Sequence, residues 1–520
     1  MTKTNRSPLL KLTALSKLTA LALLLCLFAT VAYPQQAGKQ LSRQQLSFPA
    51  RPDARSEFLH AWRGYKKYAW GHDDLKPLSK SYHDWYAQPL LMTPVDALDT
   101  MILMGLQDEA AKTRKYITQN LSFDKDIYVQ NFEITIRLLG GLLSSYQLTG
   151  DKRLLSLAED LGNRLLPVFD SPTGLPYRFV NLKTGKVRDA KTNPAEAGTL
   201  LIEFGTLSKL TRRPVFYQKA KRALIEIYKR RSPIGLVGTW IDVETGQWTN
   251  TDSHISGAID SYYEYLLKCW LLFDDQDCKR MWLNSVAAIN KYLADELDRQ
   301  TGRREVELWY GHADMNTGAR TATTYGALDA FFPAVLALSG DIDRATRLQA
   351  SSRKMWRQYG IEPEEIDYQK WEVVSPGYPL RPEIIESTYY LHHYATLRAR
   401  APRGPQRASP AGVAHSRAGR RAARGAEGKQ RLPVPSQLAS AASYRRQGQL
   451  MFEDFVKYCR TDEGYAALKS VLTKEQSDSM PSFLFAETFK YFYLLSASPQ
   501  RLDFDKVIFN TEAHPIRRTW

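Results

Sequence analysis

The hydrophobic pattern of this chain repeats a unit made of an apolar helix, a short polar turn and a more charged helix. The clearest copies of the turn are Thr149-Gly150-Asp151 and Ser339-Gly340-Asp341, where the Gly suits a left-handed helix end and the Asp can cap the next helix. Seven such helical hairpins, about 45–65 residues apart with one insertion, indicate a repeat architecture. The other turns are expected near 105–108, 208–213 and 273–277, after 395, and at 496–500.

The two helices of each predicted hairpin differ in how much of their surface is apolar. The first is apolar nearly all round, as at 138–143 (LLGGLL), and such a helix is buried on both sides. The second is amphipathic, as at 152–166, and should face solvent. The pattern therefore predicts an all-α fold with inner and outer rings of helices, an α/α toroid. A linear solenoid is the alternative, but it would expose the inner row at its ends.

Residues 507–515 (VIFNTEAHP) break the helical pattern near the end of the chain. Three apolar residues that favour strands lead into a polar turn, which predicts one short extended segment. A lone strand exposes unpaired backbone groups and must dock where they are covered. We expect it to plug the axis of the helical barrel, with Thr511 at the centre of a ring of carboxylates. We expect His514 to be a packed or hydrogen-bonded residue rather than a ligand.

Two segments fall outside the repeat. Residues 1–34 carry basic residues followed by an apolar run of about fifteen residues at 18–32, which predicts a cleaved signal peptide; an uncleaved membrane anchor is the alternative. Residues 399–443 are mostly Ala, Arg, Gly, Pro and Ser and cannot bury enough apolar surface to offset their chain entropy. They predict a disordered insertion, with a basic tether to an acidic surface and an artefact of sequence derivation as the alternatives.

The formal net charge of +16 comes mainly from these two segments. Residues 1–20 have four Lys or Arg and no acid, and residues 398–431 have ten against a single acid, Glu427. The remaining chain is close to neutral, so the sequence does not support a nucleic-acid-binding groove. With 43% hydrophobic and 11% aromatic residues, the chain has the composition of a folded protein with a large core.

The cysteines, histidines and glycines give little further indication of a catalytic or ligand-binding site. Cys269 and Cys278 form a disulfide in one interpretation and stay buried thiols in the other, while Cys459 has no obvious partner. Neither the cysteines nor the nine histidines show the spacing of a metal site. The pair Gly140-Gly141 is better explained by close helix packing than by a phosphate loop, because no strand precedes it.

Acidic residues recur close to the starts of the predicted inner helices, although burying a charge is costly unless it is compensated. The helix dipole favours an acid at an N-terminus, which explains one or two of them but not acids on six of seven inner helices. If the inner helices run parallel, their starts meet at one mouth and the acids form a funnel. These acids are Asp96, Asp99, Glu133, Glu196, Asp260, Glu264, Glu383, Glu386 and Glu487.

A funnel of carboxylates with aromatic residues nearby suits a polyhydroxylated ligand. Carboxylates accept sugar hydroxyl protons, and aromatic faces such as those of Phe132 and Phe483 cover the sugar C–H surface. Two further acids can act as general acid and general base in glycoside cleavage. The same cluster would hold a hard cation such as Ca²⁺ through oxygen ligands, many of them water.

Six segments of the chain match a family pattern in order: VDALDT (95–100), NFEITIRLLGG (131–141), DSYYEY (260–265), LRPEIIES (380–387), SFLFAET (482–488) and FNTEAHP (509–515). Together they resemble the class I α-1,2-mannosidases, glycoside hydrolase family 47, which include the mannosidase-like proteins of endoplasmic-reticulum degradation. The resemblance covers about 50–398 and 444–515. It implies an (αα)₇ barrel plugged by a C-terminal β-hairpin, with 48–398 and 444–520 as two parts of one catalytic barrel.

The resemblance also implies an activity and its residues. The activity would be that of a Ca²⁺-dependent, inverting exo-α-1,2-mannosidase acting on high-mannose glycans or mannosides. Glu133 would be the general acid, acting through a water molecule, and Glu383 the general base, with Asp260 as its rival. Thr511 would bind Ca²⁺ through its hydroxyl and carbonyl oxygens. The −1 sugar and the water shell would be lined by Arg137, Glu264, Glu364, Arg381, Glu386 and Glu487, with Phe483 stacking beneath.

The chain departs from the family pattern at a few positions. Ala327 and Ala330 stand where many members have a His and a Cys, so that family disulfide is absent. Ala258 stands where members restricted to a single linkage have an Arg, which implies broader trimming. The alternative functions are a mannose-glycan-binding, lectin-like protein without turnover and a different α/α-toroid glycosidase. We expect a monomer exported to the periplasm, the extracellular space or the secretory-pathway lumen, with no nucleic-acid partner and no stable membrane span.

Overall fold

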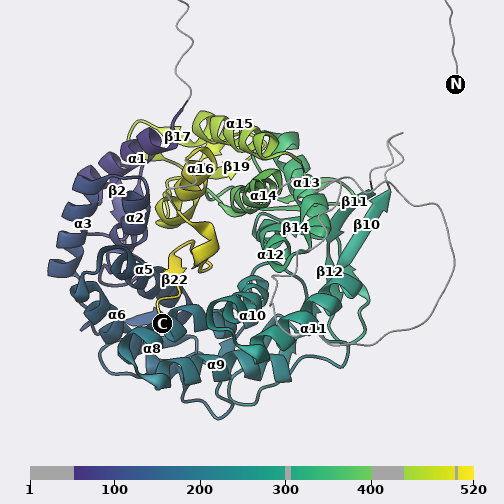
Figure 1. Cartoon of the computed structure of the whole chain (residues 1–520), viewed down its shortest axis with the longest axis horizontal. Coiled ribbons are helices and arrows are strands. Elements are labelled where there is room, and N and C mark those ends of the chain that lie inside the picture. The colour runs from purple at the N-terminus through teal and green to yellow at the C-terminus, as the bar shows by residue number, and fades with distance from the viewer. Residues whose placement is uncertain (1–51, 299–305, 401–438, 498–501) are drawn as a thin grey trace, which may run out of the picture. The chain divides into compact units, whose positions relative to one another are not determined.

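The computed structural model describes residues 52–298, 306–400, 439–497 and 502–520. The predicted signal peptide at 1–34 and residues 401–438 of the predicted insertion lie outside these ranges. Along the described chain, apolar and amphipathic helices alternate, and Figure 1 shows them as an inner and an outer ring around one axis. The predicted all-α barrel built of helical hairpins, an (αα)₇ barrel, is confirmed.

The inner ring consists of helices that are buried on most of their faces, as their apolar sequences predict. In α12, for example, every residue from Phe332 to Ala337 is buried. In chain order the inner elements are α2 (Met92–Leu103); α4 (Asn131–Ile134), η1 (Thr135–Leu139) and α5 (Gly140–Thr149); α7 (Pro194–Gly198) and α8 (Leu201–Thr211); α10 (Asp260–Phe273); η3 (Leu328–Phe331) and α12 (Phe332–Ser339); α14 (Glu383–Arg400); and η4 (Leu484–Thr488) and α16 (Phe489–Ser496).

The outer ring consists of amphipathic helices that bury one apolar stripe each. In α6 the buried residues include Leu154, Ala158, Leu161 and Leu165, which recur every three or four positions and therefore share one face. The outer helices are α1 (Ala54–Tyr68), α3 (Gln107–Asn120), α6 (Lys152–Leu165) with η2 (Leu166–Phe169), α9 (Pro214–Lys229), α11 (Gln276–Tyr292), α13 (Ile342–Tyr359) and α15 (Ala441–Cys459). No helix of the described residues combines the length and the apolarity that a membrane crossing would need.

The seventh hairpin differs from the sequence prediction. The repeat predicted a charged helix after the turn near 496–500, but the described chain continues there into η6 (Phe504–Lys506) and two strands. The outer partner of α16 is instead α1, from the other end of the chain, and Phe58 of α1 packs with its ring centroid 5.1 Å from that of Phe485. A closed ring needs an outer helix at every inner position, and the N-terminal segment supplies the last one.

The two ends of the barrel carry different connections. Short turns join the first five inner helices to the outer helices that follow them. Gly150 and Gly340 adopt positive φ angles in these turns, and Asp151 and Asp341 cap the following helices, as predicted. Helix α14 runs through Arg400 and α15 begins at Ala441, so residues 399–400 and 441–443, which were predicted to belong to the disordered insertion, are helical. A disulfide joins Cys269 and Cys278 across one such turn, and Cys459 is buried and free.

Longer connections with small antiparallel sheets join each outer helix to the next inner helix. The three-stranded sheets have the orders β3 (Tyr128–Gln130), β4 (Phe179–Asn181), β5 (Val187–Arg188); β6 (Lys191–Thr192), β7 (Trp240–Asp242), β8 (Trp248–Asn250); β13 (Arg320–Ala322), β12 (His312–Asp314), β9 (Asp252–Ser253); and β14 (Thr324–Gly326), β15 (Glu365–Asp367), β16 (Glu372–Ser375). The strand pairs in these connections are β1 (Asp74–Lys76) with β2 (Ser81–His83), β10 (Ala294–Asp298) with β11 (Val306–Tyr310), β17 (Arg460–Thr461) with β18 (Gly464–Tyr465), and β19 (Leu468–Ser470) with β20 (Glu475–Gln476). A further pair, β21 (Val507–Phe509) with β22 (Pro515–Arg517), follows the last inner helix.

The C-terminal segment is a β-hairpin that lies inside the inner ring (Figure 1). The residues alone predicted one extended segment, whereas β21 and β22 pair antiparallel, with Ile508 opposite Ile516, around a turn at 510–514. The backbone groups of each strand are thus satisfied by the other strand. The turn is deeply buried, since Asn510, Glu512, Ala513 and His514 are each at most 2% exposed.

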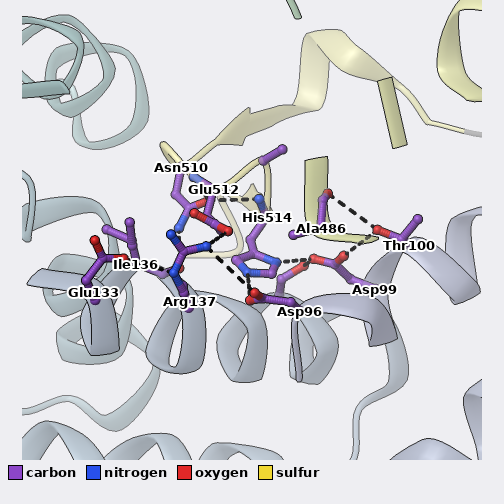
Figure 2. Close-up of polar contacts among 12 residues, drawn as sticks. Asp96, Asp99, Thr100, Glu133, Ile136, Arg137, Ala486, Asn510, Glu512 and His514 are labelled. Atoms are coloured by element: carbon purple, nitrogen blue, oxygen red, sulfur yellow. Dashed lines mark hydrogen bonds and ion pairs between the residues drawn. The ribbon is translucent and has the colours of Figure 1, made fainter. Parts of the chain in front are cut away.

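Hydrogen bonds fix the turn to the inner helices, as Figure 2 shows for α2 and the α4–η1–α5 helix. The side-chain amide of Asn510 donates to the carbonyl oxygen of Ile136 and to Glu203, at 2.8 Å in both cases. The Lys490 ammonium donates to the carbonyl oxygen of Ala513 at 2.6 Å. These contacts hold both ends of the turn, so the position of Thr511 between them is set by the barrel.

Charged groups under the turn are paired with one another. His514 Nδ1 lies 2.7 Å from Asp99 Oδ2, and Nε2 lies 3.4 Å from Asp96 Oδ1, which confirms the expectation of a packed, hydrogen-bonded histidine (Figure 2). Lys490 Nζ lies 2.9 Å from the other oxygen of Asp99. Burial alone would lower the pKa of His514, but Asp99 and Asp96 raise it to about 9. The imidazole is therefore a cation between two carboxylates at neutral pH.

Two glycines allow this close approach. A Cβ atom on Gly140 would lie 2.6 Å from Asn510 Nδ2, and one on Gly141 would lie 2.8 Å from Val95 Cγ1 and 3.2 Å from His514 Cε1. Gly140-Gly141 thus serves close packing, as predicted, and the packing partner is the hairpin turn as well as helix α2.

Gly140→Ala should destabilise the protein by about 1–3 kcal/mol, because the added methyl group must displace an amide that already donates two hydrogen bonds. Urea unfolding measured by far-UV circular dichroism checks this value. Gly150→Asn is the control: Gly150 has no atom within 4 Å of an added Cβ, and Asn tolerates its left-handed backbone. Equal stability of wild type and Gly140→Ala would contradict the close approach.

The His514 cation makes stability depend on pH. Its pKa is about 9 in the folded protein and about 6.5 in an unfolded chain. The stabilisation is therefore complete below about pH 6.5 and is lost as the pH rises towards 9, on the order of 3 kcal/mol. Urea unfolding at about pH 6.5 and 9 in EDTA should show this loss, and His514→Gln should remove most of it. His60→Gln, outside the hairpin, should keep the wild-type difference.

Candidate active site

A cavity of about 490 Å³ lies at the barrel end where the inner helices begin, and the hairpin turn contributes Thr511 and Glu512 to its lining. Its volume is in the range of small-ligand sites, roughly 300–1,000 Å³. Its acidic lining residues are Glu133, Glu196, Asp260, Glu264, Glu383, Glu386, Glu487 and Glu512. Its other conspicuous lining residues are Arg137, Arg178, Arg381, Phe132, Trp240, Phe331 and Phe483.

The acids reach the cavity because they lie in or near the first turns of parallel inner helices. Asp260 and Glu383 are the first residues of α10 and α14. Glu133 lies in α4, directly before the π-helical turn η1, and Glu487 lies within the π-helical turn η4. A π-turn inserts one extra residue into a helix and re-aims the side chains around it, and such turns are frequent at functional sites.

Ten of the eleven residues predicted for the site line this cavity, and Glu364 is the exception. Glu364 lies behind Arg381 and accepts from its Nε at 3.1 Å and its Nη2 at 2.5 Å. It therefore orients a lining residue. Asp96 and Asp99 were expected in the acidic funnel, but they lie under the hairpin turn with His514, because they sit one to two turns into α2.

The three candidate catalytic acids have different environments. Glu133 is paired with Arg137, whose Nε lies 2.9 Å from Oε2. Asp260 accepts from the Ser261 hydroxyl at 2.9 Å, and its burial raises its pKa to about 6. Burial raises the pKa of Glu383 to about 7 against the effect of Arg381, and its Oε2 is buried without a hydrogen-bond partner among the described residues.

Phe483 forms an apolar wall between the two cavity guanidinium groups. The guanidinium carbon of Arg137 lies 5.7 Å from its ring centroid, and that of Arg381 lies 6.0 Å from it. Arg137 also pairs with Glu512 in the hairpin turn. Burial alone would lower the pKa of Arg137, but Glu512 and Glu133 raise it further above its usual range. The cavity thus combines fixed positive charges with an aromatic face.

Several cavity acids have no basic partner among the residues that the structure describes. Lys268 neutralises Glu264, but none of Asp260, Glu383, Glu386 and Glu487 forms an ion pair within the described ranges of the chain. Burial, and then Glu264, raises the pKa of Glu386 to about 8. Burial, and then Glu512, raises the pKa of Glu487 well above its usual value. A cluster of this kind stays partly protonated unless a positive charge enters it.

The residues present fit a hard cation. Oxygen atoms that could bind a cation surround the cavity side of the turn, those of Thr511 among them. Oε2 of Glu383, which is buried without a hydrogen-bond partner among the described residues, is another. Thr511 is held by its backbone N–H, which donates to the Tyr265 hydroxyl at 3.2 Å. Ca²⁺ prefers oxygen ligands, including hydroxyl, carbonyl and water oxygens, in flexible geometry.

Some cavity residues were not assigned a role from the sequence. Glu196 was named only as an inner-helix acid, and it pairs with Arg178 at 2.9 Å and accepts from Gln130 at 2.8 Å. Its position could be anticipated from Asn193-Pro194, a helix start in which Asn193 caps the backbone N–H of Glu196. Arg178 and Trp240 come from sheet connections, which carry no helical period to reveal them.

A second polar cluster, absent from the sequence analysis, brings Asp252, His254 and His312 within 4.8 Å of one another. His312 Nδ1 lies 2.7 Å from Asp252 Oδ2. The backbone N–H of Ser256 donates to His254 Nδ1 at 3.2 Å, so that nitrogen is unprotonated and Nε2 carries the hydrogen, facing Thr239. This tautomer leaves Nε2 without a lone pair for a metal, so the cluster is better explained as a hydrogen-bond network.

Comparison with known proteins identifies relatives over most of the chain. The model of glycosyl hydrolase family 47 matches residues 57–398 and 437–518, which leaves out residues 399–436 of the predicted insertion. Alpha-mannosidase I MNS5 of Arabidopsis thaliana is 33% identical over 96% of this chain and 81% of its own length. The endoplasmic reticulum mannosyl-oligosaccharide 1,2-alpha-mannosidase of Rattus norvegicus is 33% identical over 90% of this chain and 69% of its own length.

Solved structures agree with these relatives. The alpha-1,2-mannosidase from Trichoderma reesei superposes with a TM-score of 0.73 and 26% identity, covering 89% of this chain and 98% of that one. The cellobiose 2-epimerase from Spirochaeta thermophila, 8% identical with a TM-score of 0.50, shares the fold alone. On the strength of the family model and of relatives that match over most of the chain, the chain belongs to glycosyl hydrolase family 47.

Proposed function

We propose that this protein is a Ca²⁺-dependent, inverting exo-α-1,2-mannosidase that removes terminal mannose from high-mannose oligosaccharides. The observation that carries the proposal is the buried ring of carboxylates around a hairpin turn that presents Thr511. The names of the Trichoderma reesei and Rattus norvegicus relatives, both 1,2-alpha-mannosidases, support the linkage.

Glu133 and Glu383 would divide the acid and base work. Glu133, held by Arg137, would give a proton through a water molecule to the glycosidic oxygen as the bond to the anomeric carbon breaks. Glu383, or its rival Asp260, would take a proton from the water that attacks this carbon from the opposite face, which inverts its configuration. The ion pair with Arg137 would then stabilise the carboxylate that Glu133 becomes.

Thr511 would hold the cation through its hydroxyl and carbonyl oxygens, with Glu386, Glu487 and their neighbours bound through water. When bound there, Ca²⁺ would supply a fixed positive charge that binds sugar hydroxyl groups and favours the ionised forms of the surrounding acids. The hairpin contributes by holding Thr511 rigidly, through Asn510 on one side and the Lys490 contact to Ala513 on the other.

The outer wall of the cavity supports an oligosaccharide as the substrate. Arg178 lies 5.6 Å from the ring centroids of both Trp240 and Phe179, and Arg188 lies 5.1 Å from that of Phe179 and 4.2 Å from that of Tyr128. This strip continues from the cavity onto the outward face of the sheet β3–β4–β5, opposite the buried Val129 and Val180. Alternating aromatic faces and N–H donors suit several successive sugar residues.

Export from the cytoplasm remains part of the proposal. Two relatives at 32–33% identity carry names that place them in, or connect them with, the endoplasmic reticulum. The predicted signal peptide and the disulfide between Cys269 and Cys278 fit an oxidising compartment.

The wild-type protein should release mannose from α-1,2-mannobiose, and EDTA should abolish the release until Ca²⁺ is restored. Glu133→Gln should lower kcat by about 10²–10⁴, because the amide cannot donate the proton. Thr511→Val should weaken Ca²⁺ binding measured by isothermal titration calorimetry. Glycan binding without release by the wild type would instead indicate the lectin-like protein. Release that EDTA leaves unchanged would favour a different toroid glycosidase.

Arg188→Ala should raise KM for a high-mannose oligosaccharide by about two- to fivefold, which corresponds to the binding free energy lost with one exposed cation–π contact. KM for α-1,2-mannobiose, which we expect to stay inside the cavity and not to reach Arg188, should not change. Arg213→Ala is the matched control, since Arg213 lies 4.7 Å from the ring centroid of Phe216 at the start of α9, at the short-turn end of the barrel. Equal effects on both substrates would argue against the strip.

A further inference from the structure

Glu203 is a fully buried acid that contacts the hairpin turn from helix α8. It is 0% exposed and does not line the cavity. Its Oε1 accepts two hydrogen bonds, from the Tyr265 hydroxyl at 2.6 Å and from the side-chain amide of Asn510 at 2.8 Å. Its Oε2 has no hydrogen-bond partner among the described residues. Tyr265 and Asn510 are thus both held by a single oxygen atom of this acid.

Tyr265 fixes the peptide group that precedes Thr511. The backbone N–H of Thr511 donates to the Tyr265 hydroxyl at 3.2 Å. Because this oxygen accepts from an N–H, its own hydrogen points elsewhere, and Glu203 Oε1 receives it. The carbonyl oxygen of the same peptide group, that of Asn510, lies 3.5 Å from Lys268 Nζ. Both ends of this peptide group are therefore held by helix α10, which carries Tyr265 and Lys268.

The Asn510 side chain fixes the peptide group that follows Thr511. The backbone N–H of Glu512 donates to Asn510 Oδ1 at 3.0 Å. The nitrogen of the same amide donates to the Ile136 carbonyl oxygen and to Glu203 Oε1, each at 2.8 Å. The amide group cannot rotate without breaking these three hydrogen bonds, so the peptide group between Thr511 and Glu512 keeps one orientation.

The two peptide groups that flank a residue determine its backbone conformation, because each residue has only two soft backbone dihedrals. With both groups fixed, the φ and ψ angles of Thr511 are fixed, and so are the directions of its carbonyl oxygen and its side chain. Both hydrogen-bond chains end at Glu203 Oε1. Hydrogen bonds linked in this way polarise and strengthen one another. The orientation of Thr511 therefore depends on one buried oxygen that does not reach the cavity.

We propose that Glu203 is a positioning residue for the cation site, which acts through Tyr265 and Asn510 to hold the carbonyl and hydroxyl oxygens of Thr511 in the orientation that binds Ca²⁺. The inference rests on the proposed function, in which Thr511 binds this cation. Residues that hold metal ligands without touching the metal typically contribute about 10–100-fold to metal affinity. A purely structural role would instead lower stability and leave the Ca²⁺ affinity of the folded protein unchanged.

Four substitutions separate positioning from stability. Tyr265→Phe removes one hydroxyl group and with it both of its hydrogen bonds. Glu203→Leu removes the acceptor oxygen, whereas Glu203→Gln keeps an amide oxygen in the place of Oε1 and puts its nitrogen where Oε2 has no described partner. Tyr325→Phe is the matched control, because the buried Tyr325 hydroxyl bonds to Ser352 Oγ at 2.8 Å, between strand β14 and helix α13.

Isothermal titration calorimetry of the EDTA-treated protein with Ca²⁺ gives the Kd of each variant, and far-UV circular dichroism checks that each is folded. The Kd should rise by about 10–100-fold in Tyr265→Phe and Glu203→Leu. It should stay within about threefold of the wild-type value in Glu203→Gln, because an amide oxygen accepts the same two hydrogen bonds. Tyr325→Phe should keep the wild-type Kd, whatever its stability.

Glu203→Leu leaves two buried donors unpaired. If it does not fold, Glu203→Asp takes its place, since Asp withdraws the acceptor by one methylene group and should also raise the Kd. A wild-type Kd in folded Tyr265→Phe would overturn the proposal. So would a Kd in Glu203→Gln that rises as far as in Glu203→Leu, or in Glu203→Asp where that variant is used, because the role needs an acceptor oxygen and not a charge.

The titration, combined with an assay of mannose release, separates this inference from the proposed function. Unchanged Kd values in the Tyr265 and Glu203 variants overturn the inference even where mannose release is confirmed. A wild type that binds Ca²⁺, with the expected order of Kd values among the variants, but releases no mannose contradicts the proposed enzyme and leaves the role of Glu203 standing. A wild type that binds no Ca²⁺ overturns both.

Discussion

The structure depends on one constraint, the pairing of charges beneath the C-terminal hairpin turn. His514 and Lys490 together compensate Asp99, and Arg137 compensates Glu512, so that a polar turn is stable at the centre of an apolar ring. Removing one partner of such a pair leaves a buried, uncompensated charge, which is far more costly than never burying the pair. The pairing therefore fixes the turn, and the turn fixes the floor of the cavity.

The two faces of this turn have opposite electrostatic character. Below it the carboxylates are paired, and the pKa of Asp99 is lowered to about 2 by Lys490 and His514 against the effect of burial. Above it, Glu386 and Glu487 are buried and form no ion pair with a basic residue in the described part of the chain, and burial raises their pKa values. The paired charges below the turn thus stabilise the fold, whereas the carboxyl groups above it lack compensating charges, as expected where local stability is given up for function.

Chain direction explains why the chemistry gathers at one end. Every described inner helix is entered from a longer connection with small sheets, and short capped turns are confined to the other end. Helix starts, with their positive dipole ends and acidic residues, therefore meet the variable connections at the same mouth. Substitutions in these connections, at residues such as Trp240 and Arg188, can therefore alter the outer wall of the cavity without altering the helices of the barrel.

The sequence by itself determined the two rings, the capped turns at Gly150 and Gly340, and the gathering of helix-start acids, because helical periodicity and capping are local signals. Only the tertiary structure decided that Asp96 and Asp99 lie under the hairpin and that α1 completes the ring. These outcomes depend on side-chain direction and on contacts between residues far apart in the chain. No local pattern of polar and apolar positions encodes either of them.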